Sequence, residues 1–297
     1  MARQFQGTLT ALVTPFCPSS SAETVDYQAL GNLLEWQIDQ GVSGVVVCGT
    51  TGEAATLSNG ERREILSFVV RQAAGRLQVV AGTGTNSTKQ TIEFSKEAQA
   101  SGADGVLLVS PYYNKPTQEG LYQHFATVAQ TLGDLPVLLY NIPGRTCVNI
   151  EIPTLKRLAE IPNIVGIKEA CDSVSRLMEI SSFADESFSL LAGDDPTIYS
   201  VMTANGVGVI SATSNVFPRE VRAITDNALR CDWPAALRAQ QFLLPRVRSL
   251  FSETNPGPIK MALEIMGIIP SAQMRLPLVA VSSSTKSMLE NMLAERR

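Results

Sequence analysis

The stretch NIVGIKEACD, residues 163–172, joins an apolar run to a lysine and a glutamate. Residues 164–167 are uninterrupted apolar positions, which is typical of a strand buried on both faces of a parallel sheet. A cation at the rim of such a run is costly unless it is paired or discharged. Lys168 therefore marks the end of a predicted buried strand, and its presence there calls for a chemical reason.

Apolar runs of the same kind recur along the chain, and stretches with helical periodicity lie between them. One such stretch, residues 89–102, ends at Gly102, a helix stop signal. Units of about 30 residues that alternate strand and helix predict right-handed crossovers, and eight of them favour an α/β (β/α)8 TIM barrel over an open doubly wound sheet. The eight predicted strands span residues 8–14, 44–48, 77–82, 105–110, 136–141, 164–169, 188–193 and 206–211.

Two other features bear on this organisation. The segment GTGTNS, residues 82–87, lacks the third glycine of a dinucleotide-binding loop, so it favours a strand-to-helix turn with Asn86 or Ser87 as N-cap. After residue 211 the alternation stops and helical patterns follow, including residues 258–266 and 285–297. We therefore expect a catalytic barrel over residues 1–232 and a small C-terminal helical extension over residues 233–297, packed on the barrel.

The composition excludes several classes of function. A net charge of -4 gives no basic surface for nucleic acid, and no lysine or arginine block indicates an anionic membrane. Residues 1–10 contain no apolar signal core, and the five cysteines form no CxxC pair, so we expect reduced thiols in a cytoplasmic protein. The single histidine, His124, excludes a multi-histidine zinc site; its helical pattern predicts a half-exposed helix residue rather than a catalytic base.

Barrel enzymes act at the C-terminal ends of their strands, so the residues there are the candidates. Hydroxyl, cationic and acidic side chains gather at these ends, and no metal-binding set of Asp, Glu and His emerges. The segment GDDP, residues 193–196, is interpreted as a helix start with Asp195 as N-cap. The candidates are Thr50, Thr51, Glu53, Tyr112, Tyr113, Tyr140, Arg145, Lys168, Glu169, Ile210 and Ser211.

The lysine now has a chemical explanation. A free lysine has a pKa of about 10.4, and burial among apolar strands disfavours the ammonium and lowers that pKa toward about 7–8. The product is a nucleophilic amine that can attack a carbonyl and form a Schiff base. Tyrosine and threonine hydroxyls can pass the protons, and Arg145 can hold a carboxylate with its planar guanidinium. These residues suggest a 2-oxo acid as substrate. Adjacent strand residues point to opposite faces, so Glu169 is poorly placed to pair with Lys168.

The same residues carry a family resemblance. The motifs GTTGE, SPYYNKPTQEG, YNIPGRT, GIKEA, GDD and ETNP-PIK, in this order and across almost the whole chain, resemble those of 4-hydroxy-tetrahydrodipicolinate synthase (dihydrodipicolinate synthase). This family lies within the class I pyruvate-dependent aldolases, which include N-acetylneuraminate lyase. This sequence has AGDD where the family often has SGDD, and NPGPIK where NPIPVK is usual.

The resemblance implies a condensation of pyruvate with L-aspartate-4-semialdehyde in lysine and diaminopimelate biosynthesis, without a cofactor, in a homotetramer built from tight dimers. It implies that Lys168 forms the Schiff base, that Tyr140 donates and accepts protons, and that Thr50 and Tyr113 complete the relay, Tyr113 coming from a neighbouring subunit. The implied substrate contacts are Thr51, Arg145, Gly193 and Ile210. The implied inter-subunit pocket for L-lysine contains Ala55, Asn86, Gln90 and Tyr112, with Gln90 at the position that is acidic in strongly inhibited members.

Two other functions stay open at this stage. One is an aldolase or lyase that cleaves a longer 2-oxo sugar acid such as N-acetylneuraminate in the same cleft. It ranks second because the sialic-acid lyases resemble GSTGE and lack an arginine at the position of Arg145. The other is a non-catalytic small-molecule binder on the same barrel, against which the intact set of Lys, Tyr, Thr and Arg argues.

Overall fold

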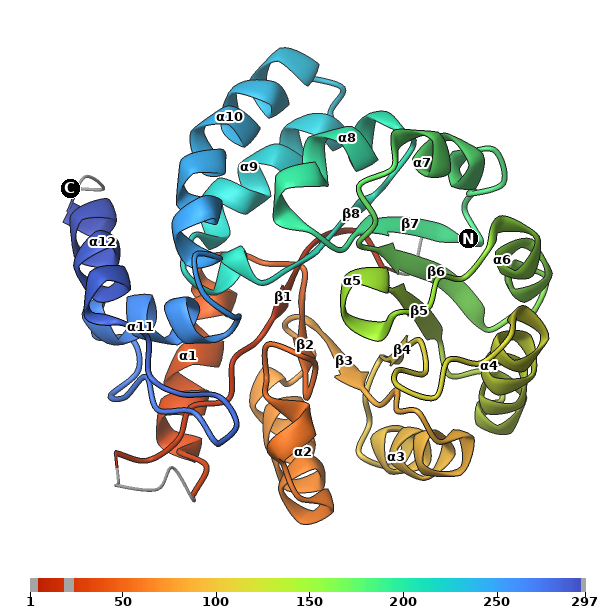
Figure 1. Cartoon of the computed structure of the whole chain (residues 1–297), viewed down its shortest axis with the longest axis horizontal. Coiled ribbons are helices and arrows are strands. Elements are labelled where there is room, and N and C mark those ends of the chain that lie inside the picture. The colour runs from red at the N-terminus through yellow and green to blue at the C-terminus, as the bar shows by residue number, and fades with distance from the viewer. Residues whose placement is uncertain (1–4, 19–23, 295–297) are drawn as a thin grey trace.

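The chain forms a closed barrel of eight parallel strands surrounded by helices (Figure 1). The computed structural model describes residues 5–18 and 24–294. The strands follow the order of the sequence, and the first pairs with the last, so the prediction of a (β/α)8 TIM barrel is confirmed. The strands are β1 (Gly7–Ala11), β2 (Gly44–Val47), β3 (Gln78–Gly82), β4 (Gly105–Val109), β5 (Val137–Asn141), β6 (Ile164–Glu169), β7 (Ser189–Ala192) and β8 (Gly208–Ser211).

The barrel has two apolar layers, which explains why its strands are apolar at nearly every position. Alternate strand residues fill the interior, among them Leu9, Val46 and Leu138. The residues between them pack outward under the helices, as Val45 and Leu139 do. Because the side chains alternate between these layers, each strand sends every second residue toward the barrel axis.

The pairing of β5 with β6 contains one irregularity. Val137 is opposite Ile164, but the next residue, Leu138, is opposite Gly166, so the register shifts between these two pairs. Beyond the shift the pairing is regular, and Tyr140 is opposite Lys168.

Helices cover the outside of the barrel, and several begin at the side-chain caps that their sequences encode. The Asp26 carboxylate accepts a hydrogen bond from the backbone N–H of Ala29, and Ser58 and Glu61 form a capping box. Ser87 rather than Asn86 caps α3, which ends two residues before Gly102. The covering helices are α1 (Tyr27–Asp39), α2 (Asn59–Ala73), α3 (Thr88–Ala100), α4 (Gln118–Leu132), α6 (Ile152–Ala159), α7 (Val174–Ser181), α8 (Ile198–Thr203) and α9 (Pro218–Leu229). The short helix α5 (Pro143–Thr146) lies over the mouth of the barrel instead (Figure 1).

Three further helices follow α9: α10 (Trp233–Leu250), α11 (Gly257–Ile265) and α12 (Ser283–Ala294). The helix α10 packs against α9, and α11 and α12 pack against each other (Figure 1). The predicted helix over residues 285–297 is confirmed up to residue 294, and residues 295–297 lie outside the described part. The division of the chain at residue 232 stays a prediction. Within the described ranges, no helix is both long enough and apolar enough to cross a membrane.

Candidate active site

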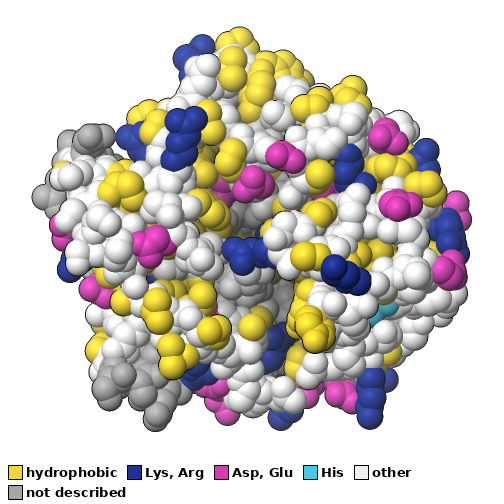
Figure 2. Space-filling view, in the orientation of Figure 1, with side chains coloured by type: hydrophobic (Ala, Val, Ile, Leu, Met, Phe, Trp, Pro, Cys, Tyr) yellow, Lys and Arg dark blue, Asp and Glu magenta, His cyan; other side chains and the backbone are white. Residues whose placement is uncertain are grey.

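A cavity of about 720 Å³ opens at the C-terminal ends of the strands. The space-filling view shows this face hollowed at its middle, over the end of the barrel (Figure 2). The location agrees with the rule that barrel enzymes act at this end. The cavity brings together most of the predicted substrate and catalytic residues: Thr50, Thr51, Tyr140, Arg145, Lys168, Gly193 and Ile210.

Lys168 stands on β6 at the wall of this cavity, and its side chain is only 6% exposed. Burial lowers the pKa of its amine to about 8, which confirms the direction expected from the sequence. The carboxylates of Asp195 and Asp194 oppose this shift, and the Arg145 guanidinium adds to it. About a tenth of Lys168 is therefore a free amine at pH 7 and about half at pH 8, far more than for a lysine with the usual pKa.

Tyr140 is the neighbour of Lys168 across the sheet. The two residues are directly opposite each other on β5 and β6, and the Lys168 ammonium nitrogen lies 4.2 Å from the centre of the Tyr140 ring. Burial raises the pKa of the Tyr140 phenol above its usual value, although the nearby Arg145 opposes the shift. Tyr140 is therefore a protonated hydroxyl beside an amine that loses its proton more readily than an ordinary lysine.

Glu169 does not pair with Lys168, as the alternation of strand side chains predicts. Its carboxylate accepts hydrogen bonds from Asn141 Nδ2 at 2.8 Å and from Arg176 Nε at 3.0 Å. Burial raises the pKa of Glu169, and the Arg176 charge counteracts part of that effect. The negative charge of Glu169 is thus balanced by Arg176 and not by Lys168, so it does not raise the lowered pKa of the Lys168 amine.

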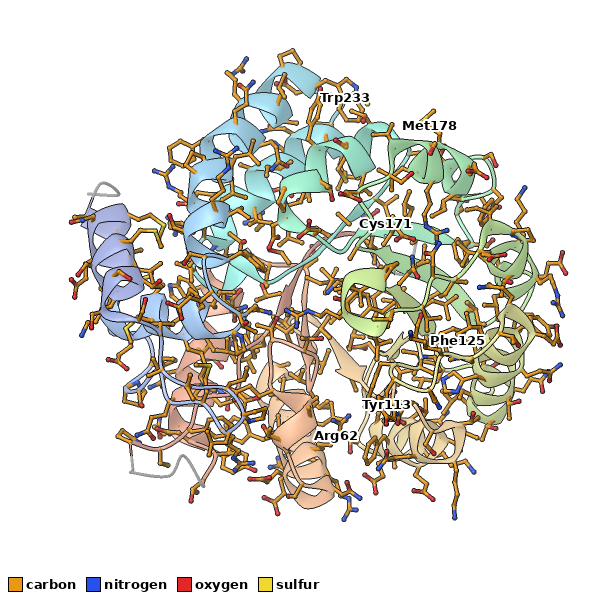
Figure 3. All side chains as sticks on the ribbon, viewed as in Figure 1. Arg62, Tyr113, Phe125, Cys171, Met178 and Trp233 are labelled. Atoms are coloured by element: carbon orange, nitrogen blue, oxygen red, sulfur yellow. The ribbon has the colours of Figure 1, made fainter. Side chains whose placement is uncertain are left out.

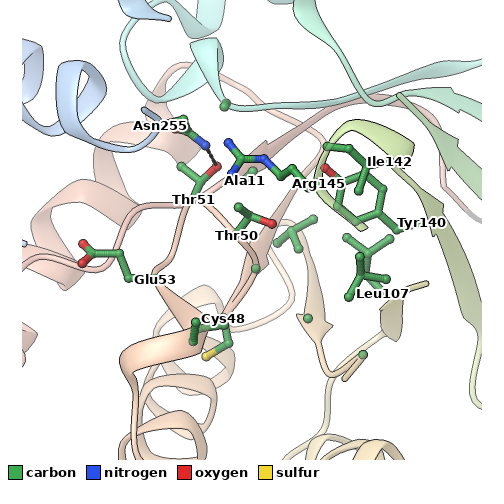
Figure 4. A pocket seen from close by; sticks show the side chains of 18 of the residues that line it. Ala11, Cys48, Thr50, Thr51, Glu53, Leu107, Tyr140, Ile142, Arg145 and Asn255 are labelled. Atoms are coloured by element: carbon green, nitrogen blue, oxygen red, sulfur yellow. Dashed lines mark hydrogen bonds between the residues drawn. The ribbon is translucent and has the colours of Figure 1, made fainter. Parts of the chain in front are cut away.

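The two threonines come from the loop after β2. Thr50 and Thr51 both line the cavity, and the Thr51 hydroxyl accepts a hydrogen bond of 2.9 Å from Asn255 Nδ2 (Figure 4). Arg145 lies on the short helix α5, and its side chain projects over the cavity on the side of Thr51 and Asn255 (Figure 4). The guanidinium at this edge is placed to meet a carboxylate that enters the pocket.

The segment after β7 contributes Gly193, Asp194 and Asp195 to the wall. A side chain at position 193 would meet Glu169 O at 2.9 Å, so this close approach of β6 and β7 requires glycine. The prediction that Asp195 caps a helix is wrong. The short helix η2 (Asp195–Thr197) follows Asp194, while the buried Asp195 carboxylate accepts hydrogen bonds from the N–H and hydroxyl of Thr213, at 3.0 and 2.7 Å. A contact 18 residues away in sequence takes the place of the local cap.

Tyr113 does not reach this cavity within the chain. It lies in the loop between β4 and α4, is 89% exposed and has a positive φ of 73° (Figure 3). Its role at a neighbouring subunit's site stays a prediction. A side chain so exposed in a strained conformation is available to another subunit.

The residues of the expected L-lysine pocket are partly assembled. Ala55, Gln90 and Tyr112 line one side of the cavity, whereas Asn86 does not line it. The sequence analysis missed Arg62 of α2, which lines the same side (Figure 3). Its guanidinium donates to the carbonyl oxygens of Ala54 at 3.2 Å and Gly82 at 2.6 Å, and lies 4.3 Å from the centre of the Phe94 ring.

The prediction that His124 is half exposed is wrong. The side chain is 5% exposed, its Nδ1 lies 2.9 Å from the Thr88 hydroxyl, and burial lowers its pKa to about 4. It packs against Phe125 edge to face and does not line the cavity. The buried face of α4, which packs against α3, is thus wider than the stripe of apolar residues along α4 predicts.

The sequence analysis also missed the contribution of the C-terminal segment to the cavity wall. Asn255 belongs to the motif ETNP-PIK, so a signal was present, but its partner Thr51 is 204 residues away in sequence. The wall residues from this segment are Phe251, Thr254, Asn255, Pro277 and Leu278. Among residues 5–18 and 24–294, no group of three or more His, Cys, Asp and Glu side chains is arranged to hold a metal ion.

The fold and the site together define a class of protein: (β/α)8-barrel enzymes whose strand ends form a pocket suited to carbonyl chemistry. The model of the dihydrodipicolinate synthetase family matches residues 4–296. A 4-hydroxy-tetrahydrodipicolinate synthase from Aquifex aeolicus is 45% identical over 97% of this chain and 97% of its own length. This chain therefore belongs to the dihydrodipicolinate synthetase family.

Solved structures agree with this assignment. The crystal structure of dihydrodipicolinate synthase from Aquifex aeolicus has a TM-score of 0.94 at 44% identity, covering 98% of each chain. The chloride-inhibited dihydrodipicolinate synthase from Acinetobacter baumannii, complexed with pyruvate, has a TM-score of 0.93 at 41% identity, again covering 98% of each chain.

Proposed function

We propose that this chain is a lyase that condenses pyruvate with L-aspartate-4-semialdehyde to 4-hydroxy-tetrahydrodipicolinate, a step of lysine and diaminopimelate biosynthesis. The observation that carries the proposal is Lys168, a buried lysine with a pKa of about 8 beside the Tyr140 ring in the cavity. Family membership and the similarity to enzymes named for this reaction support the same conclusion.

In the proposed reaction, the free amine of Lys168 attacks C2 of pyruvate to form a carbinolamine, which loses water and becomes an iminium ion. Loss of a methyl proton gives an enamine, whose carbon attacks the aldehyde of the second substrate. The new alkoxide takes up a proton, the product amine displaces Lys168 as the ring closes, and the free lysine is regenerated. The covalent lysine takes the place of a cofactor.

The protons need carriers, and the neutral hydroxyls supply them. Tyr140, whose pKa burial raises, donates a proton to the carbinolamine and takes one back. Thr50 lies in the same cavity and links this exchange to Tyr113, which we propose is supplied by a neighbouring subunit. The high exposure of Tyr113 supports this assignment.

The remaining polar groups would orient the substrates. Thr51, Gly193 and Ile210 line the cavity with Lys168 and are the proposed contacts of pyruvate, while Arg145 holds the carboxylate of the semialdehyde. Since the relay needs a second subunit, we propose a homotetramer built as a dimer of dimers. A biosynthetic enzyme with five free cysteines also suits the reducing cytoplasm.

Borohydride reduction in the presence of pyruvate, followed by peptide mapping, tests the chemistry. We expect a stable pyruvate adduct on the peptide that contains Lys168, and the absence of an adduct would refute the proposal. A substrate panel then separates the synthase from a sugar-acid lyase: turnover should require pyruvate with L-aspartate-4-semialdehyde, and preferential cleavage of N-acetylneuraminate would reject the synthase.

A further inference from the structure

We propose that the buried ion pair between Glu53 and Lys260 is a positioning device, which fixes the loop that carries Thr50 and Thr51 against the C-terminal segment. This inference rests on the proposed function, because Thr50 has a place in a proton relay only if the Schiff base forms. It assigns to Glu53 and Lys260 a task in catalysis without contact with the reacting atoms.

The ion pair is sealed inside the protein. Lys260 Nζ lies 2.7 Å from Glu53 Oε1, and neither side chain is exposed. The same nitrogen donates to the carbonyl oxygen of Thr14 at 2.9 Å and lies 4.2 Å from the centre of the Phe16 ring. Replacing a buried ion pair with apolar side chains is often neutral for stability or better, so stability alone gives little reason for this pair.

Glu53 is held in a conformation that its residue type rarely adopts. Its φ is 57°, in the left-handed region, and such a conformation persists only where the surroundings hold it. Both oxygens of its carboxylate are engaged, because Oε2 accepts the backbone N–H of Arg275 at 3.1 Å. One residue earlier, the carbonyl oxygen of Gly52 accepts the Thr14 hydroxyl at 2.8 Å. The turn is therefore fixed immediately after the threonine pair.

The C-terminal segment also contacts the threonine pair directly. Asn255 precedes α11, the helix that carries Lys260, and its amide donates to the Thr51 hydroxyl at 2.9 Å (Figure 4). One segment thus contacts the turn at two points, Thr51 and Glu53. The position of Thr50 at the cavity wall then depends on a part of the chain outside the eight strand–helix units.

The test compares the wild type with Lys260→Met, which removes the cation, and with Glu53→Gln/Lys260→Met, which removes both charges. The measurements are kcat, KM for pyruvate, the borohydride adduct, the exchange of pyruvate methyl protons with deuterium followed by NMR, and the thermal midpoint. Glu35→Gln is the matched control, since Glu35 forms an exposed bidentate pair with Arg76 on the outer surface.

We expect methyl-proton exchange and kcat to fall about tenfold to a hundredfold in both Lys260 variants, because a small misplacement of a relay group has effects of this size. KM for pyruvate should change less than kcat, because Asn255 still holds the Thr51 hydroxyl. The adduct should form in full, since Lys168 is untouched. The double variant should regain thermal stability without regaining kcat, which a merely structural role would not produce. Glu35→Gln should match the wild type throughout.

Wild-type kcat and exchange in the folded double variant would overturn the positioning role. The same conclusion would follow if activity simply tracked the folded fraction in each variant. If Lys260→Met does not fold, the double variant alone decides. If the wild type forms no pyruvate adduct, the proposed function fails instead, so the two failures are distinguishable.

Discussion

Replacing Lys168 with methionine should abolish the pyruvate adduct and, at neutral pH, make the folded chain more stable. The stabilising effect follows from the environment of the lysine. Burial lowers its pKa from 10.5 to about 8, so at pH 7 folding carries a charged group into surroundings that disfavour it. A shift of this size means that burying the charged lysine costs roughly 3 kcal/mol of folding free energy. A methionine of similar length carries no charge, so the variant avoids this cost.

The effect should depend on pH in a defined direction. Because the pKa is lower in the folded chain, the unfolded chain binds more protons between about pH 8 and 10.5, and the wild type gains stability as the pH rises through that window. The advantage of Lys168→Met should therefore shrink to roughly 1.5 kcal/mol at pH 9.5.

Urea unfolding at pH 7.0 and 9.5, at one protein concentration, measures both values. Lys96→Met, at an exposed lysine of α3, is the control and should change little at either pH. A Lys168→Met protein less stable than the wild type at pH 7, or a difference independent of pH, would refute the account of the lysine as a buried, partly discharged amine. Lys168→Arg should also form no adduct, because a guanidinium stays charged.

The remaining predictions concern pH, assembly and regulation. The rate of adduct formation should rise with pH and reach half its maximum near pH 8, where half of Lys168 is a free amine; a rate that falls with pH would contradict this. Mixed Lys168→Ala and Tyr113→Phe subunits, each inactive alone, should regain activity after exchange, and no recovery despite proven exchange would count against shared sites. L-Lysine should inhibit weakly or not at all, because Gln90 offers no charge to its amine and Arg62 adds a like charge; losing a charge-assisted bond weakens binding about ten- to thirtyfold. Near-complete inhibition of initial rates at submillimolar lysine would reject this, and Gln90→Glu should strengthen any binding that occurs.

The barrel and much of its mouth could be predicted because both depend on local patterns. Continuous apolar runs mark buried parallel strands, and the residue that ends each run lies at the mouth by topology alone. Lys168, Tyr140 and Thr50 were found in this way, and the lowered pKa of Lys168 follows from its position at the end of an apolar strand.

What could not be predicted depends on contacts between distant segments. Asp195 has the local signature of an N-cap, yet its carboxylate bonds Thr213 in the next strand-end loop. His124 lies beside a clear apolar stripe of α4, but its burial depends on how closely α3 approaches. That approach is evident only in the structure, where the Thr88 hydroxyl lies within hydrogen-bond distance of His124 Nδ1. The pairing of Glu53 with Lys260 joins positions 207 residues apart, so no local pattern announces it.

The register shift between β5 and β6 determines which side chains face each other in the site. Val165 is the extra residue in that pairing. If the register of Val137 with Ile164 continued without a shift, Tyr140 would be opposite Ile167, and Lys168 would be opposite Asn141. A strand has a period of two residues, so a slip by one position exchanges its inward and outward side chains. In β6 that slip would bring the Glu169 carboxylate into the cavity and send the amine under the helices. The bulged residue near the start of β6 therefore determines which side chains of this strand face the cavity. An insertion or deletion between Gly166 and Lys168 would turn the Lys168 amine away from the cavity.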